Sequence, residues 1–257
     1  MRVLRLGVIV PSSNTALEPL TQEIVASLND CRTLGLTVTV HFARFRVTTI
    51  ALSASANAQF TLEPMLDAAR LLGDAHVDVI GWSGTSASWL GFESDEKLCQ
   101  AIQEATGIPA TTAVQGMNWV IRGEKENVAL VTPYTADLNQ AIQKNYASIG
   151  IDISDGRSRY AGLSDNVSFS AVDDPVLDKM VDEVVQNGAQ TVLIMCTNVR
   201  AAHRASYWES LYADKDLIVV DSVAATVTAM LQRLGIQFRD NSLARQWGRI
   251  FGFDFSD

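Results

Sequence analysis

Small hydroxyl residues gather directly after an apolar segment at residues 77–80. Gly84, Thr85 and Ser86 begin this turn, and a segment of helical character follows them. A strand that ends in such a turn and then opens a helix can hold an anion, because backbone N–H groups point out of a helix N-terminus. Between residues 79 and 94 the only carboxylate, Glu93, lies at the far end. We therefore expect the turn to bind an anion and the reactive group to come from another part of the chain.

Three further segments have the same chemical character. They read PSSNT at 11–15, TPYT at 132–135 and CTN at 196–198. In open α/β sheets, ligands bind at the carboxyl ends of the strands, where such loops meet. A cleft rich in hydroxyls and amides and poor in charge suits a small carboxylate held by hydrogen bonds. Cys196 would bring a thiol to this cleft, although a buried cysteine is also common as a small apolar residue.

Short apolar runs alternate with helix-length segments along the chain. Their spacing predicts strands at 4–10, 36–42, 77–82, 127–132, 191–196 and 217–221. It predicts helices at 17–28, 62–73, 96–107, 137–150, 175–188 and 223–235, and all but the first of these segments end in Gly, a common residue just past a helix C-terminus. This alternation is typical of α/β proteins with parallel sheets and helices on both faces.

The pattern also occurs twice. LGVIVPSSNTALEPL has a counterpart in NVALVTPYTADLNQA, and VDVIGWSGTS matches QTVLIMCTN, so that Gly84 corresponds to Cys196. The repeat predicts two similar lobes, each a parallel sheet flanked by helices, related by pseudo-twofold symmetry with the active site between them. We expect an N-terminal α/β lobe at 1–115, for which 222–257 is a candidate completion, and a second α/β lobe at 116–221.

Several stretches resemble the aspartate/glutamate racemase superfamily, in particular its branch of maleate cis-trans isomerases and arylmalonate decarboxylases. In chain order they are GVIVPSSNTALEP, FARFRVTTI, GTSASWLG, EATGIPATT, VTPYTADLN, LSDNVSFSAV and MCTNVRA. They cover most of the chain in the order expected for this branch. The resemblance implies a two-lobed, duplicated fold and an enzyme that acts on a small carboxylate without a cofactor.

The resemblance to the isomerases implies roles for individual residues. Asn14, Tyr134 and Asn166 match the positions that hold substrate carboxylates, and Cys196 matches the second of two catalytic cysteines. The first cysteine would fall at Gly84 and is therefore missing.

In this respect the sequence is similar to arylmalonate decarboxylase, which has the same GTS turn and keeps one cysteine. Thr85, Ser86 and Tyr134 match the side chains that cradle its carboxylate, although the two residues of the turn could also serve as helix caps. Thr197 and Asn198 follow the isomerase pattern instead, because the decarboxylase has two glycines there. We expect both residues, together with the backbone at Gly84, to contribute to substrate binding.

A single cysteine limits the chemistry. Racemisation by two bases needs a group on each face of the α-carbon, whereas decarboxylation needs a cradle for the developing enediolate and one acid. Our first interpretation is a decarboxylase with Cys196 as the acid. The alternatives are a maleate-type isomerase in which Cys196 is the nucleophile, and an ectoine-utilisation-type family member that binds a carboxylate without catalysis.

Composition excludes several other classes. A net charge of −9 argues against nucleic acid or an anionic membrane as the main partner. The longest early apolar run, Leu6 to Val10, is too short for a membrane span or a signal segment, so we expect a soluble cytoplasmic protein, with a homo-oligomer left open. The three cysteines and three histidines are widely spaced, and neither GxGxxG nor GxxxxGK[ST] occurs. We therefore expect no metal and no cofactor.

Overall fold

The computed structural model describes residues 2–31, 35–123, 127–236 and 241–252. The strands are β1 (Arg2–Pro11), β2 (Leu36–Phe45), β3 (Val79–Trp82), β4 (Ala110–Thr112), β5 (Val128–Thr132), β6 (Ser158–Tyr160), β7 (Thr191–Ile194) and β8 (Ile218–Asp221). The α-helices are α1 (Leu17–Asp30), α2 (Ala54–Asn57), α3 (Leu62–Asp74), α4 (Ala87–Leu90), α5 (Glu93–Thr106), α6 (Ala113–Val120), α7 (Ala136–Ser148), α8 (Asn166–Phe169), α9 (Asp174–Gln186), α10 (Ala205–Leu211), α11 (Ser222–Arg233) and α12 (Asn241–Trp247). Short 3-10 helices are η1 (Ala58–Phe60), η2 (Ile121–Gly123), η3 (Asp155–Arg157), η4 (Ala202–Arg204), η5 (Ala213–Lys215) and η6 (Arg249–Gly252).

The strands form two parallel sheets with the same connectivity. Their orders are β2-β1-β3-β4 and β6-β5-β7-β8, so each strand of the first sheet has an equivalent in the second. The expected α/β fold of two similar lobes, each a parallel sheet flanked by helices, is confirmed. Because the strands are parallel, the loops after β1, β3, β5 and β7 leave their sheets at the carboxyl edges.

The predicted elements agree closely with the observed ones. Each predicted strand and helix is present, and the strands β4 and β6 were not predicted. Both are three-residue edge strands, which are too short to show an alternating pattern. The expectation that the second predicted helix stops at Gly73 is wrong, because α3 continues to Asp74. The positive backbone angle after this helix belongs to His76, with φ of 51°.

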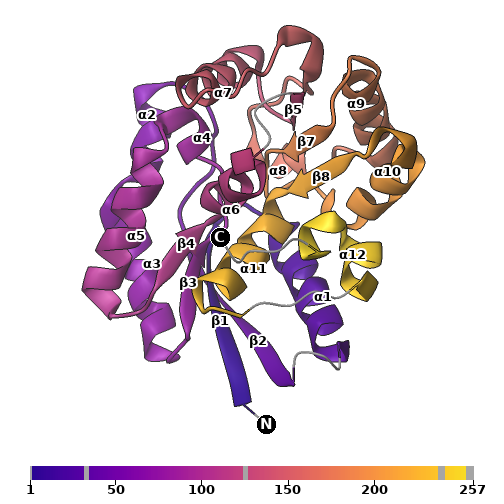
Figure 1. Ribbon diagram of the computed structural model, residues 1–257. Helices are drawn as coiled ribbons and strands as arrows, with labels where there is room; N and C mark the ends of the chain where they lie inside the picture. The colour runs from indigo at the N-terminus through magenta and orange to yellow at the C-terminus, as the bar shows by residue number, and fades with distance from the viewer. Residues whose placement is uncertain (1, 32–34, 124–126, 237–240, 253–257) are drawn as a thin grey trace.

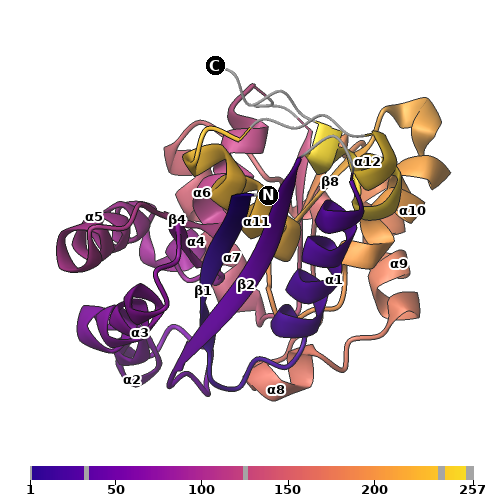
Figure 2. The ribbon, with the colours of Figure 1, turned by 90° about the horizontal axis from the view of Figure 1, so that it is seen from below.

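Helices cover both faces of the first sheet. Helices α3 and α5 pack on one side of it, and α1 and α11 on the other (Figure 2). Helix α11 reaches β3 and β4 of the first sheet although it follows β8 of the second, and it crosses α6 at the junction of the lobes (Figure 1). Gly116 permits this crossing, since a Cβ there would lie 2.4 Å from the carbonyl oxygen of Ala225.

The C-terminal helices contact both lobes. Helix α12 packs against α1 and α10, and the Trp247 indole donates a hydrogen bond of 3.0 Å to the Ser27 hydroxyl. The contact of α12 with α1 supports the proposal that the segment 222–257 completes the first lobe. Residues 237–240 and 253–257 of this segment lie outside the described residues. The lobe limits at 1–115 and 116–221 likewise stay proposals. Among the described helices, none is long and apolar enough to span a bilayer.

Candidate active site

The predicted site residues lie where strands of both sheets end. Asn14 follows β1, Gly84 follows β3, Tyr134 follows β5 and Cys196 follows β7. Each of the predicted side chains is at most 5% exposed. The structure therefore brings residues of both lobes together in one buried cluster.

Asn14 and Thr197 link the two halves of the cluster. The Asn14 side chain accepts hydrogen bonds from the backbone N–H groups of Ala16 and Leu17 at the start of α1, and its amide donates to Thr197 Oγ1 at 3.2 Å. The Thr197 hydroxyl in turn donates to the Ser83 carbonyl at 3.1 Å. The Asn14 side chain thus caps the start of α1, while its expected role in substrate binding stays a prediction.

Asn198 and Asn166 form a second link between the lobes. Asn198 Oδ1 accepts from the backbone N–H of Thr15 at 2.9 Å, and its amide donates to the Asn166 carbonyl. The Asn166 amide donates to Ser13 Oγ at 2.7 Å. Both asparagines thus hydrogen-bond to other residues of the protein, and their expected role in substrate binding stays a prediction.

Tyr134 connects the hydroxyl turn to the thiol. Its phenol oxygen lies 2.8 Å from Thr85 Oγ1, and it also hydrogen-bonds the Cys196 side chain. Trp89 and Phe169 hold the Tyr134 ring by edge-on contacts, with centroids 5.5 and 5.3 Å away. The position of the hydroxyl is therefore set by packing on its ring.

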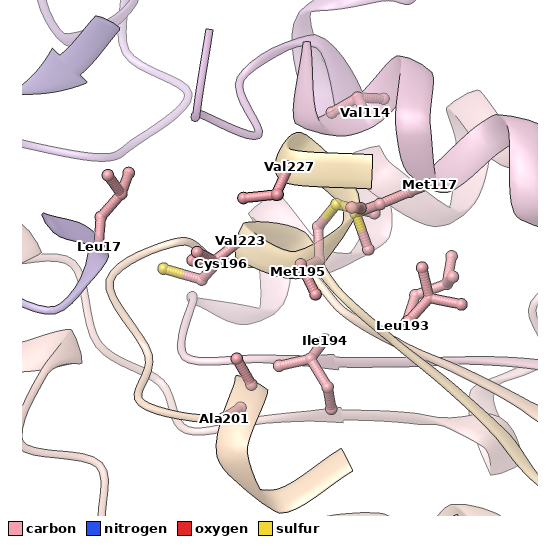
Figure 3. Close-up of a cluster of buried hydrophobic side chains, with 14 of the residues drawn as sticks. Leu17, Val114, Met117, Leu193, Ile194, Met195, Cys196, Ala201, Val223 and Val227 are labelled. Atoms are coloured by element: carbon pink, nitrogen blue, oxygen red, sulfur yellow. The ribbon is translucent and has the colours of Figure 1, made fainter. Parts of the chain in front are cut away.

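Burial decides the protonation state of the thiol. It raises the pKa of Cys196 to about 12, although hydrogen bonds from Tyr134 and from the Asn198 backbone N–H act in the opposite direction. The Asn198 nitrogen lies 3.4 Å from the sulfur. Figure 3 shows the sulfur pointing away from Met195 and Met117 of the apolar core, towards the side on which Leu17 lies. The buried site thus presents a protonated thiol.

The buried carboxyl group of Asp221 acts on the Cys196 thiol through its charge. Asp221 ends β8 and is fully buried, and its charge helps to raise the pKa of Cys196. One oxygen caps α11 by accepting from the N–H groups of Val223 and Ala224 at 2.8 and 3.0 Å, whereas the other oxygen has no hydrogen-bond partner. Burial raises the pKa of Asp221 itself to about 7.

The remaining predicted residues belong to the turn after β3. Gly84 is packed against the ring of Trp82, and Ser86 precedes α4, where its carbonyl accepts from the Leu90 N–H at 2.9 Å. Ser86 therefore joins the cluster through the backbone of the turn, next to Thr85.

Sequence reasoning did not identify three residues of the cluster. Ser13 lies in the PSSNT segment, Trp82 ends the predicted strand 77–82, and Asp221 ends the predicted strand 217–221. A carboxylate directly after the apolar run LIVV is a signal that could have identified Asp221. In the repeated half, Thr112 lies at the position that corresponds to Asp221. Within the described ranges, no three His, Cys, Asp or Glu side chains gather into a group that could hold a metal.

The fold and the cluster together define a class of protein. Two repeated α/β lobes, with one thiol among hydroxyl and amide groups at their junction, place the chain in the aspartate/glutamate racemase-like superfamily, in its branch of maleate isomerases and arylmalonate decarboxylases. Within this branch the chain belongs to the arylmalonate decarboxylase family, whose model matches residues 6–247. It is an enzyme of the isomerase or lyase type, as its sequence predicted.

Individual relatives agree with this assignment. A maleate isomerase of Pseudomonas putida is 26% identical over 246 residues, which are 92% of this chain and 94% of the relative. The crystal structure of the maleate isomerase Iso from Pseudomonas putida S16 is similar with a TM-score of 0.76 at 25% identity, covering 94% of this chain and 97% of that one. A maleate cis-trans isomerase mutant of Nocardia farcinica, with a covalently bound succinylcysteine intermediate, has the same fold, with a TM-score of 0.81 at 19% identity over 98% and 99% of the chains.

Proposed function

We propose that the protein decarboxylates a small malonate-type dicarboxylate and that Cys196 is the proton donor. The observation that carries this proposal is that a single thiol lies beside the hydroxyl turn: Thr197, directly after Cys196, donates to the carbonyl of Ser83, directly before Gly84. A pKa of about 12 keeps Cys196 protonated at neutral pH, as an acid must be before it acts. Gly84 takes the place at which a second acid–base side chain would be needed for racemisation.

The proposed reaction is balanced with one thiol. The bond between the α-carbon and one carboxylate breaks, CO₂ leaves, and the electron pair forms an enediolate with the remaining carboxylate. Hydroxyls of Thr85 and Tyr134 and the amide of Asn14 are the donors that would stabilise this charge. Cys196 then gives its proton to the α-carbon, and the thiolate recovers a proton from water.

Isomerisation of maleate is the second candidate. It is favoured by the similarity to maleate isomerase over nearly the whole chain and by the isomerase-like Thr197 and Asn198, which are anchored in the cluster. In this case the Cys196 thiolate adds to the double bond, the single bond rotates, and the thiolate leaves again. The route needs the Cys196 thiol to lose its proton before it adds to the double bond, whereas decarboxylation begins from the protonated thiol, the form that burial favours in the free protein.

One experiment separates these reactions. Wild-type protein and the Cys196→Ala variant are incubated in D₂O with phenylmalonate, methyl(phenyl)malonate and maleate, and proton NMR follows each compound. Loss of CO₂ from a malonate, abolished in Cys196→Ala, supports the proposal. Formation of fumarate without decarboxylation supports isomerisation, and binding without turnover supports a carboxylate-binding protein.

We also propose that the protein works in a reducing compartment such as the cytoplasm. The free thiols of Cys99 and Cys196 support this, because oxidation of Cys196 would remove the proposed acid.

A further inference from the structure

The residues at the end of β3 alternate between two sides of the sheet. Gly81 faces α11, since a Cβ there would lie 3.1 Å from Thr226 Cγ2. Ser83 faces the same helix, and its hydroxyl lies 3.1 Å from Thr226 Oγ1. Trp82 and Gly84 therefore point to the opposite side, where they share one space.

The Trp82 ring already fills the space that a side chain at position 84 would need. A Cβ atom on Gly84 would lie 2.0 Å from Cζ2, 2.4 Å from Cε2 and 2.5 Å from Cη2 of the indole. Carbon atoms that are not bonded approach each other to about 3.5–4.0 Å. Even an alanine at this position therefore requires the indole to move.

Packing holds the indole in this place. Trp82 is 1% exposed, and its ring packs on Phe45 at a centroid distance of 5.2 Å. Its backbone lies in the middle of the sheet, paired with Ile9 on one side and with Thr112 on the other. A shift of the ring would have to displace core side chains, because protein interiors are close-packed.

The same turn borders the thiol. Thr197, directly after Cys196, donates to the carbonyl of Ser83, directly before Gly84. Thr85, directly after Gly84, lies 2.8 Å from the Tyr134 hydroxyl, which hydrogen-bonds the Cys196 side chain. Position 84 thus lies between Ser83 and Thr85, both of which are connected to Cys196 or its neighbour Thr197. A second reactive side chain would have to stand at this position.

We propose that Trp82 is the residue that confines this enzyme to chemistry with a single cysteine. The indole occupies the space of a second acid–base side chain, so that the replacement of Gly84 alone cannot create one. The structural part of this inference stands on the packing, and its chemical consequence rests on the proposed function.

A double-mutant cycle in thermal unfolding tests the structural part. We expect Gly84→Ala to lower the Tm by about 5 °C, because the added Cβ overpacks the core at this position. In a Trp82→Leu background the same substitution should lower the Tm by less than about 2 °C. Gly73→Ala is the matched control in both backgrounds, since its Cβ would meet nothing closer than 3.9 Å. Equal effects of Gly84→Ala in both backgrounds would overturn the proposal. If Trp82→Leu does not fold, Trp82→Met takes its place.

Racemisation tests the chemical part. Gly84→Cys and the double variant Trp82→Leu/Gly84→Cys are incubated in D₂O with one enantiomer of 2-phenylpropionate. In the double variant, one cysteine thiolate takes the α-proton and the other thiol returns a deuteron to the opposite face, so we expect racemisation at least about tenfold faster than in Gly84→Cys alone. Equal rates would show that Trp82 does not confine the chemistry. If wild-type protein decarboxylates no malonate, the proposed function fails, while the unfolding cycle still decides the role of Trp82.

Discussion

Replacement of Asp221 by Asn should stabilise the protein at alkaline pH and much less at acidic pH. Asp221 is fully buried, and burial raises its pKa from 3.8 to about 7. A carboxyl whose pKa is raised on folding stabilises the folded state below pH 3.8, and this contribution is lost as the pH rises to about 7. At 1.36 kcal/mol per pH unit, the full loss is on the order of 4 kcal/mol. Asparagine removes the charge and keeps the oxygen that caps α11.

The comparison of two pH values isolates this electrostatic effect. Asparagine also buries an NH₂ group, but the cost of that group does not depend on pH. Between pH 5 and about 7, ionisation of Asp221 in the unfolded state lowers the free energy of unfolding of the wild type further. The effect of Asp221→Asn on this free energy should therefore be more favourable at pH 8.5 than at pH 5 by ~3 kcal/mol. Urea unfolding of both proteins at the two pH values measures the difference. An effect of the same size at both pH values would show that Asp221 is not a buried, unpaired charge.

Two further substitutions test the site and the junction of the lobes. Tyr134→Phe should lower kcat about 100-fold, as for the loss of one donor to a developing oxyanion, and should slow alkylation of Cys196 by iodoacetamide, because the hydrogen bond that favours the thiolate is gone. An unchanged alkylation rate would contradict this contact. Gly116→Ala should destabilise the protein by ~1–3 kcal/mol in urea unfolding, since its Cβ would meet the Ala225 carbonyl at 2.4 Å, whereas Gly73→Ala, in an open helical position, should be neutral or stabilising. Equal effects of the two alanines would mean that α6 and α11 do not approach closely at this crossing.

The elements that position the site could be predicted because their pattern is long and periodic. Helices such as α3 and α9 carry several turns of regularly spaced apolar residues, and the buried strands β5 and β7 are continuous apolar runs. The duplication then predicted that the loop at Gly84 and the loop at Cys196 belong together, and the hydrogen bond from Thr197 to the Ser83 carbonyl joins these two loops.

Other features depend on contacts that no local pattern contains. Trp82 reads as a core aromatic in the sequence, and its relation to Gly84 follows only from the alternation of β3 relative to α11. The pKa of Cys196 depends on burial by both lobes, so the choice between acid and nucleophile could not be made from the residue order. Asn14 pairs with the Thr197 hydroxyl and Asn198 with the Thr15 backbone N–H, and spacing cannot predict these partners because they lie far away in the chain.

The configuration of the product tests most directly whether Cys196 is the single proton donor. Wild-type protein and Cys196→Ala are given methyl(phenyl)malonate in D₂O, and the 2-phenylpropionate formed is examined by proton NMR and chiral chromatography. We predict one deuterium on the α-carbon and one enantiomer from the wild type, and no product from Cys196→Ala although it still binds the substrate. A racemic product, or turnover by Cys196→Ala at the wild-type rate, would contradict a mechanism with one thiol on one face.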